Sequence, residues 1–244
     1  MKKELAIIGY GRFGRCAAHH LKKRFRVVVA DVRKITNVEK GIFDDTIEAA
    51  ATKPIVIMAV PIHQTATLLR KIAPLLAPKT LVCDVCSVKE QPLQWMKKLL
   101  PAGVYILGTH PLFGPDSAAE SLRGRAIALC PVRIPRAKMK RVRSLFFSMG
   151  LHIVTMTATE HDRLMAGTLF LTQFVGRGLL RMKLPRTRVS TQHFQFLQRL
   201  VEVTQNDTHE LFCDMHRYNR FAHSVPQDLV AAFQKTHRSL RLKP

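Results

Sequence analysis

The first two thirds of the chain alternate short apolar runs with longer amphipathic stretches. Seven runs have the composition of β-strands, and they cover residues 5–9, 26–31, 54–60, 80–85, 104–108, 126–132 and 151–156. Helical patterns such as 62–76 and 89–100 lie between most of them. Continuous apolar strands that alternate with helices are typical of a parallel sheet covered on both faces. The pattern predicts a Rossmann-like, doubly wound, mostly parallel α/β domain over residues 1–156.

Beyond residue 156 the strand signals end. Thr157 and Glu160 have the spacing of a capping box, which predicts a helix that starts there and extends past Leu180. Three more helices are predicted over residues 192–205, 208–219 and 226–240. Residues 157–244 are therefore expected to form an all-helical second domain.

The segment "IIGYGRFG" carries the G-x-G-x-x-G pattern at the junction of the first strand and the first helix. In that context the first glycine allows a tight turn, the second a close approach to a pyrophosphate, and the third close packing of helix and strand. The helix N-terminus then faces the phosphates with unpaired N–H groups. The predicted cofactor-binding residues are Gly9, Tyr10, Gly11, Arg12, Phe13, Gly14, Asp31, Val60 and Pro61. The alternative is a Rossmann-like turn that binds no nucleotide.

Asp31 ends the second predicted strand, where an acidic residue accepts hydrogen bonds from the adenosine ribose. A carboxylate there repels a 2′-phosphate, which favours NAD over NADP. Arg33 and Lys34 follow closely and soften that preference.

Three segments come directly after the third, fourth and fifth predicted strands, and they cover residues 59–65, 84–90 and 108–115. Ligands of open α/β sheets bind beyond the carboxyl ends of the strands, so these segments should converge. They bring Ser87, Lys89 and His110 near the expected nicotinamide. Histidine is suited to accept a hydroxyl proton during hydride transfer, and Ser87 is expected to hold that hydroxyl or the imidazole. The alternative is a loop histidine that caps backbone carbonyls.

Composition adds a strong positive charge: 39 Lys and Arg against 17 Asp and Glu give +22. Such a balance favours anionic partners, or it is a solvated basic surface. The five cysteines are odd in number and irregularly spaced, so we expect no disulfide framework and no metal site at Cys83 and Cys86. With no apparent signal peptide or membrane span, a soluble cytoplasmic protein is expected.

The segments "GYGRFG", "VPIH", "SVKEQPLQ", "GTHPLFGPDS" and "TEHDRLMAGTLFLTQFVGR" together resemble the prephenate and arogenate dehydrogenases of tyrosine biosynthesis. The resemblance extends over residues 4–235. It implies that His110 accepts the 4-hydroxyl proton of a cyclohexadienol while hydride passes to the nicotinamide. The ring carboxylate leaves as CO₂ and the ring aromatises. The resemblance also implies that Ser87 holds the hydroxyl or the imidazole, and that the helical domain forms a homodimer.

The sequence departs from the family at Gln173, where members commonly have a substrate-binding histidine. Glutamine still donates and accepts hydrogen bonds but carries no charge. Some members have an arginine in a later helix for the substrate carboxylate, and Phe194 falls near that place here. Arg177, one helical turn after Gln173, is the candidate replacement; its alternative role is that of a surface or dimer-interface arginine.

The leading hypothesis is an NAD-dependent prephenate dehydrogenase, because a basic protein suits a dianionic substrate. Arogenate, in which an ammonium replaces a keto group, is the second candidate substrate. A third hypothesis is a relative that has lost catalysis and serves as a sensor or nucleic-acid-binding module. The intact glycine motif, Ser87 and His110 argue against the third hypothesis, and a nucleic-acid or membrane partner is not expected.

Overall fold

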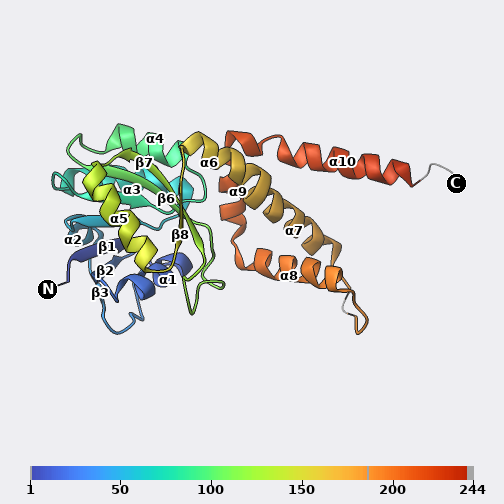
Figure 1. Ribbon diagram of the computed structural model, residues 1–244, viewed down its shortest axis with the longest axis horizontal. Coiled ribbons are helices and arrows are strands. Elements are labelled where there is room, and N and C mark those ends of the chain that lie inside the picture. The colour runs from blue at the N-terminus through green and yellow to red at the C-terminus, as the bar shows by residue number, and fades with distance from the viewer. Residues whose placement is uncertain (1, 186, 241–244) are drawn as a thin grey trace. The chain divides into compact units, whose positions relative to one another are not determined.

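The apolar runs form one eight-stranded sheet in the computed structural model, which describes residues 2–185 and 187–240 (Figure 1). Its strands are β1 (Glu4–Ile8), β2 (Arg26–Ala30), β3 (Ile42–Asp44), β4 (Ile55–Met58), β5 (Leu81–Asp84), β6 (Tyr105–Pro111), β7 (Ala126–Arg133) and β8 (His152–Thr155). The order across the sheet is β3-β2-β1-β4-β5-β6-β7-β8, and only the pairing of β6 with β7 is antiparallel. The predicted Rossmann-like, mostly parallel sheet is confirmed. The three-residue strand β3 was not predicted.

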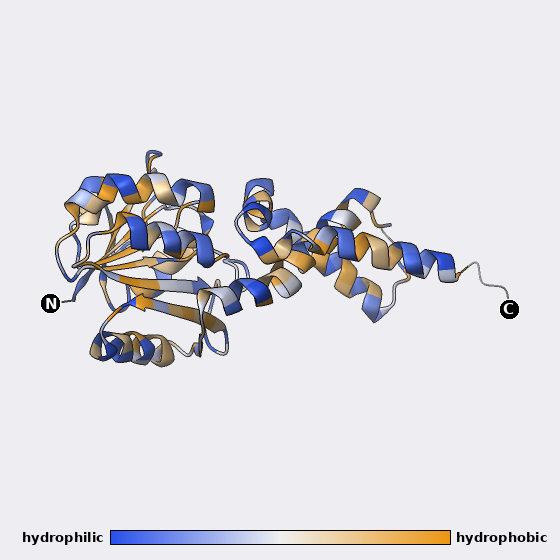
Figure 2. Cartoon of the chain, turned by 90° about the horizontal axis from the view of Figure 1, so that it is seen from above, coloured by the Kyte–Doolittle hydropathy of each residue, from blue (hydrophilic) through white to orange (hydrophobic). Residues whose placement is uncertain are grey.

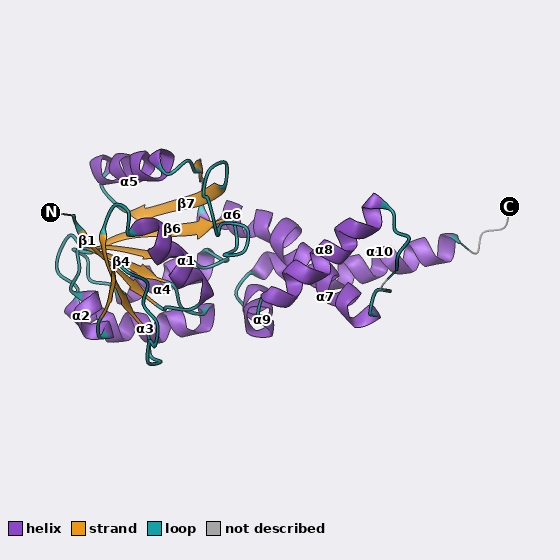
Figure 3. Ribbon diagram, turned by 90° about the horizontal axis from the view of Figure 1, so that it is seen from below, coloured by secondary structure: helices purple, strands orange, loops and turns teal. Residues whose placement is uncertain are grey.

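Helices cover both faces of the sheet because strand residues alternate between two apolar clusters (Figure 3). Ala6 and Ile8 of β1 pack with the helices on one face: α2 (Ile47–Ala51), α3 (Thr65–Ile72) and α4 (Glu90–Leu99). Leu5 and Ile7 point to the other face, which is covered by α1 (Arg12–Leu21) and α5 (Arg136–Ser148). The predicted helix 62–76 consists of α3 between two 3₁₀ turns, Ile62–Gln64 and Ala73–Leu75.

The chain divides into two compact units, residues 1–161 and 162–244, and the division falls inside helix α6 (Ala158–Met165). As the capping box predicts, the Thr157 hydroxyl accepts a hydrogen bond from the amide of Glu160, at 3.1 Å. A π-helical turn, Ala166–Phe170, joins α6 to α7 (Leu171–Met182), so the helical backbone continues past Leu180. The remaining elements are α8 (Gln192–Asn206), α9 (His209–Arg217), a 3₁₀ turn (Arg220–Ala222) and α10 (Val225–Ser239).

The second unit has its own aromatic core. The rings of Phe170 and Phe212 stack with centroids 5.3 Å apart, and Phe174 lies 6.4 Å from Phe212. Helices α7 and α8 approach closely at Gly176, where a side chain would collide with the Thr204 hydroxyl. Figure 2 shows that the helices of this unit mix apolar and polar turns. Over the described residues, none of these helices has the length and apolar character needed to cross a bilayer.

Candidate active site

The glycine motif forms the turn between β1 and α1. Gly9 has φ +101°, and its amide donates to the Ala30 carbonyl of β2 at 2.7 Å. A Cβ on Gly14 would lie 2.0 Å from the Gly9 carbonyl oxygen, so helix and turn pack with no room for a side chain. These two positions therefore require glycine for the reasons that the sequence indicated.

Gly11 differs from its two neighbours in the motif. A Cβ there would meet no described atom within 4 Å, so the space above it is open. Gly11 is also the N-cap of α1 and makes no side-chain capping bond. A helix N-terminus beside open space is what a pyrophosphate requires of this turn. The residues present fit a dinucleotide.

Asp31 lies just beyond β2 with only 10% of its side chain exposed. Burial raises the pKa of its carboxyl, but the amides of Arg33 and Tyr10 donate to it at 2.9 and 2.7 Å and the Arg33 guanidinium lies beside it. The net effect lowers the pKa of Asp31, so the group is an anion at neutral pH. The exposed Arg33 side chain turns back toward Asp31, with Nε and Oδ1 3.4 Å apart.

The other predicted cofactor residues surround the same turn. Tyr10 is buried, with the Arg15 guanidinium 4.5 Å from its ring centroid. Val60 and Pro61 follow β4, and the Val60 side chain borders Gly9. Arg12 and Phe13 contact the segment after β6: Arg12 pairs with Asp116 at 2.6 Å, and the rings of Phe13 and Phe113 are 6.4 Å apart.

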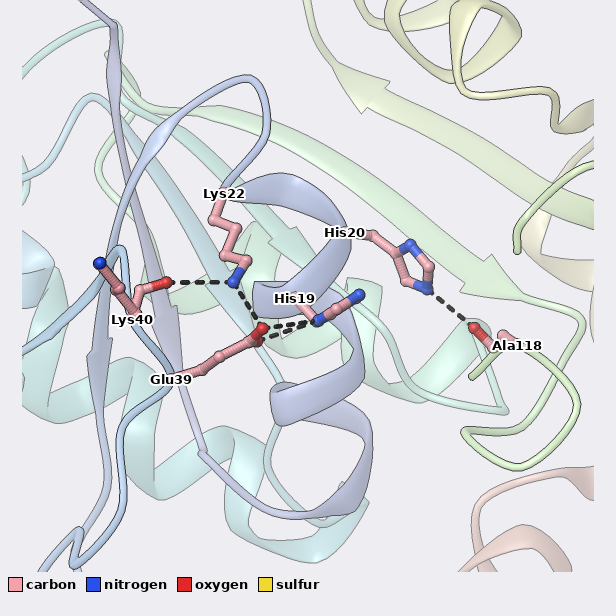
Figure 4. A network of polar contacts seen from close by, with 6 residues as sticks. All are labelled: His19, His20, Lys22, Glu39, Lys40 and Ala118. Atoms are coloured by element: carbon pink, nitrogen blue, oxygen red, sulfur yellow. Dashed lines mark hydrogen bonds and ion pairs between the residues drawn. The ribbon is translucent and has the colours of Figure 1, made fainter. Parts of the chain in front are cut away.

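A cavity of about 490 Å³ lies over α1, between the segments 37–39 and 115–119. Figure 4 shows the polar contacts of three lining residues, His19, His20 and Glu39: Glu39 bridges His19 and Lys22, and the buried His20 contacts the Ala118 carbonyl. Burial is the largest effect on His20 and lowers its pKa. These contacts attach both flanking segments to the helix that begins at the glycine turn.

His110 lies within a strand, which corrects the expectation of a loop. β6 continues to Pro111, and His110 pairs in register with Ala128 of β7. The strand is longer than its apolar run because antiparallel β7 supplies hydrogen-bond partners for residues 108–111. The side chain is 7% exposed, and its Nδ1 lies 2.9 Å from Nε2 of His161. Burial, then His161, then Lys89 hold the pKa of His110 well below 6.5.

His161, which no sequence pattern singled out, lies in the first turns of α6 with no exposed surface. It is 51 residues from His110, and no local spacing connects the two. The only signal in the sequence was its place just after the capping box, inside a segment that carries the family resemblance.

Lys89 and Asp84 form an ion pair with no exposed surface, and the charge of Lys89 acts on His110. The Asp84 carboxylate also accepts from the amide of Cys86 at 3.0 Å, and the Thr109 hydroxyl donates to the Asp84 carbonyl at 2.5 Å. Cys83 and Cys86 are unbridged and buried, and burial raises the pKa of each thiol to about 12. Thiols in that state are poor metal ligands and nucleophiles at neutral pH.

Ser87 follows β5 in the segment that ends at Lys89. Its hydroxyl oxygen is buried and has no hydrogen-bond partner among the described residues. The imidazole of His110 is instead held at Nδ1 by His161. Of the two roles considered for Ser87, holding the imidazole and holding a substrate hydroxyl, the geometry within the first unit favours the second.

Gln173 and Arg177 both lie on α7 and both contact the turn between α8 and α9. Gln173 is 4% exposed and donates from Nε2 to the Asp207 carboxylate at 2.6 Å. Its Oε1 is buried without a hydrogen-bond partner among the described residues. Arg177 donates to the carbonyls of Asp207 and Thr208 at 3.0 and 2.9 Å, and its guanidinium lies 4.8 Å from the Phe212 ring centroid.

The sequence of this chain is similar to those of known dehydrogenases. A family model described as "Prephenate dehydrogenase, nucleotide-binding domain" matches residues 17–155, more than half of the chain. Arogenate dehydrogenase 2, chloroplastic, of Arabidopsis thaliana is 30% identical over 97% of this chain and 70% of its own length. The chain belongs to the prephenate/arogenate dehydrogenase family.

Other members of the family extend the comparison. Arogenate dehydrogenase 1 of the same plant is 29% identical, and this chain spans 39% of its length. The model "TYRAAT1-like, C-terminal domain" matches residues 178–243. The prephenate dehydrogenase of A. aeolicus in complex with hydroxyphenyl propionate and NAD⁺ has a TM-score of 0.74 at 16% identity, over 99% of this chain and 90% of that one. Synechocystis arogenate dehydrogenase has a TM-score of 0.71 at 21% identity, over 98% and 92%.

Proposed function

We propose that this family member catalyses the NAD-dependent oxidative decarboxylation of a cyclohexadienol in tyrosine biosynthesis. The observation that carries the proposal is His110, a buried histidine whose Nδ1 is engaged and whose pKa is held well below 6.5. Such an imidazole is neutral at physiological pH and accepts a proton at Nε2 when its own proton is on Nδ1.

His110 accepts the 4-hydroxyl proton of the substrate in the proposed reaction. The C4–H bond breaks as hydride leaves, the ring carboxylate departs as CO₂, and the ring becomes aromatic. NAD, when bound, supplies the hydride acceptor. The buried, unpartnered hydroxyl of Ser87 is suited to hydrogen-bond the same substrate hydroxyl and so to orient it.

We infer a preference for NAD over NADP from Asp31. A carboxylate at the end of β2 accepts hydrogen bonds from ribose hydroxyls and repels a 2′-phosphate. Arg33, a cation close to this site, is turned toward Asp31 itself. The A. aeolicus structure contains NAD⁺, which supports the same inference. Asp31→Ser should lower the affinity for NAD and reduce the NAD-to-NADP preference, as measured by kcat/KM with each cofactor.

We infer a preference for arogenate over prephenate from the surroundings of Gln173 within the helical unit. The positive charge of the chain by itself favours prephenate, but Gln173, the predicted substrate-binding residue, donates to a carboxylate, Asp207. A carboxylate attracts the ammonium of arogenate and offers nothing comparable to the keto group of prephenate. The two Arabidopsis relatives, both named arogenate dehydrogenases, support this choice.

The test mixes purified protein with each pairing of NAD or NADP and prephenate or arogenate, and follows reduced-cofactor absorbance. His110→Ala should lower kcat by about 10² to 10⁴. His152→Ala, which removes an exposed histidine of the same unit, is the matched control and should leave kcat unchanged. No turnover with any pairing would refute the enzymatic function and favour a non-catalytic relative.

Asp207→Asn separates the two substrates. It should lower kcat/KM for arogenate and raise it for prephenate, because it removes the negative charge and keeps the hydrogen-bonding shape. Asp228→Asn, at an exposed carboxylate of α10, is the matched control. A parallel loss with both substrates would assign Asp207 a structural role only.

A further inference from the structure

The two buried histidines, His110 and His161, share one hydrogen-bonding contact, and that contact constrains which nitrogen of His110 carries a proton. The Nδ1 of His110 and the Nε2 of His161 are 2.9 Å apart, a hydrogen-bond distance between two ring nitrogens. Between two neutral imidazoles, one nitrogen of the pair must donate and the other must accept.

Only one of the two arrangements leaves a base. If His110 donates from Nδ1, its Nε2 has a lone pair and can accept a proton. If His161 donates from Nε2, the proton of His110 sits on its own Nε2 and the ring cannot act as a base. The identity of the donor in this one contact therefore decides whether His110 can react.

His161 is held in place by its own helix and by a neighbouring side chain. Its amide donates to the Thr157 carbonyl at 3.0 Å in the first turn of α6. The Thr159 hydroxyl donates to the Glu90 carboxylate at 2.5 Å, which fastens this turn to the start of α4, next to Lys89. The ring itself is completely buried. The buried ring of His161 is therefore held against the Nδ1 of His110.

We propose that His161 is a positioning residue that accepts the Nδ1 proton of His110 and thereby keeps the Nε2 of His110 unprotonated. The proposal rests on the proposed function, since it deepens the role of His110 as proton acceptor. In many enzymes a carboxylate orients the catalytic histidine and stabilises its charged form. A neutral imidazole gives the same orientation without adding a negative charge.

The groups around His110 disfavour its protonated form, so the imidazole releases an accepted proton readily. From α6 it faces His161, and from the segment before α4 it faces Lys89, whose charge is compensated by Asp84. Burial and these two neighbours all lower the pKa of His110. The neutral, active form is therefore retained down to a pH below the ordinary histidine range, and activity should fall only when the pH drops through that lowered pKa.

The first test needs no substrate. In ¹⁵N-resolved NMR of the full chain at neutral pH, His110 should show a protonated Nδ1 and a bare Nε2. His161→Leu should release this preference and bring in the Nε2-protonated form. His161→Gln, whose side-chain carbonyl can accept the same proton, should restore the original form. A bare Nδ1 in the unmodified protein, or an unchanged tautomer in His161→Leu, would overturn the proposal.

The second test is kinetic. His161→Leu should lower kcat by about 10- to 100-fold with little change in KM, as for other partners that orient a functional histidine, and His161→Gln should recover most of it. His161→Glu should move the acid limb of kcat/KM to higher pH, because an anion stabilises the protonated His110. His152→Leu is the matched control. Loss of activity in His161→Gln equal to that in His161→Leu would reduce His161 to a packing residue.

The two tests fail separately. If the unmodified protein turns over neither substrate while the tautomers behave as expected, the proposed function fails and the positioning role stands. If turnover is normal and the tautomers do not respond to His161, the proposed function stands and the positioning role fails. If His161→Leu does not fold, the tautomer in the unmodified protein and in His161→Gln still decides.

Discussion

At the scale of single residues, the role of the ion pair between Lys89 and Asp84 depends on its burial as much as on its charges. Lys89 and Asp84 are five residues apart in sequence, but only the fold removes both from water and brings the charge of Lys89 close enough to act on His110. A buried ion pair gains little net stability, yet breaking it leaves an uncompensated charge. The pair therefore fixes the segment between β5 and α4, on which Ser87 also stands.

Lys89→Met should lower the free energy of unfolding by about 3–5 kcal/mol, because the Asp84 carboxylate remains buried without its cation. Urea denaturation followed by circular dichroism measures the change. The double variant Lys89→Met with Asp84→Leu should regain a substantial part of the loss. Equal stability of the single variant and the unmodified protein would mean that the carboxylate is satisfied in another way.

At the scale of elements, two glycines of the strand–turn–helix unit of β1 and α1 have different roles: Gly14 is needed for packing, and Gly11 is available for binding. A Cβ on Gly14 would meet the Gly9 carbonyl at 2.0 Å, while one on Gly11 would meet no described atom within 4 Å. The first position is filled by the protein's own backbone, and the second is open for a ligand.

Gly14→Ala should destabilise the protein by about 1–3 kcal/mol, the usual cost of forcing an extra carbon into a packed site. Gly11→Ala should leave the melting temperature close to that of the unmodified protein and weaken NAD binding. Differential scanning fluorimetry and calorimetric titration with NAD measure the two effects. Unimpaired NAD binding by Gly11→Ala would refute the approach of a pyrophosphate to this position.

On the scale of the whole molecule, two surface properties indicate binding partners: the charge of +22 and the exposed apolar side chains of the helical unit. The charge should attract an anionic substrate at a distance, an effect that salt screens. On α8 and α10, large apolar residues remain exposed: Phe196, Leu197, Val203, Val230 and Phe233. Their spread over two helices favours the homodimer that the family resemblance implied.

Raising the salt concentration from low to well above physiological should lower kcat/KM by about three- to tenfold and change kcat much less, because steering acts on encounter and not on chemistry. Steady-state kinetics over a salt series measures it. A kcat/KM that does not change with salt would leave the positive charge without a role in capturing the substrate.

Phe233→Glu should convert a dimer into a monomer, because the side chain, 60% exposed in the single chain, would place a charge in the interface. Light scattering coupled to size-exclusion chromatography measures the mass. Val189→Glu, at an exposed position outside the helices, is the matched control and should remain dimeric. A monomeric unmodified protein would contradict the predicted homodimer.

The sequence by itself determined the features that depend on local spacing. The strand–glycine–helix pattern, Asp31 at the end of the next strand and the cap at Thr157 each follow from neighbours within one supersecondary unit. Tertiary structure alone decided the rest. Pairing with the antiparallel strand β7 extends β6 through His110. The sequence could not show this direction, because the side-chain periodicity of a strand is the same in parallel and antiparallel pairs. His110 contacts His161, 51 residues away in sequence, and Gln173 contacts Asp207, 34 residues away. Tertiary packing creates such contacts, and no local sequence spacing predicts them.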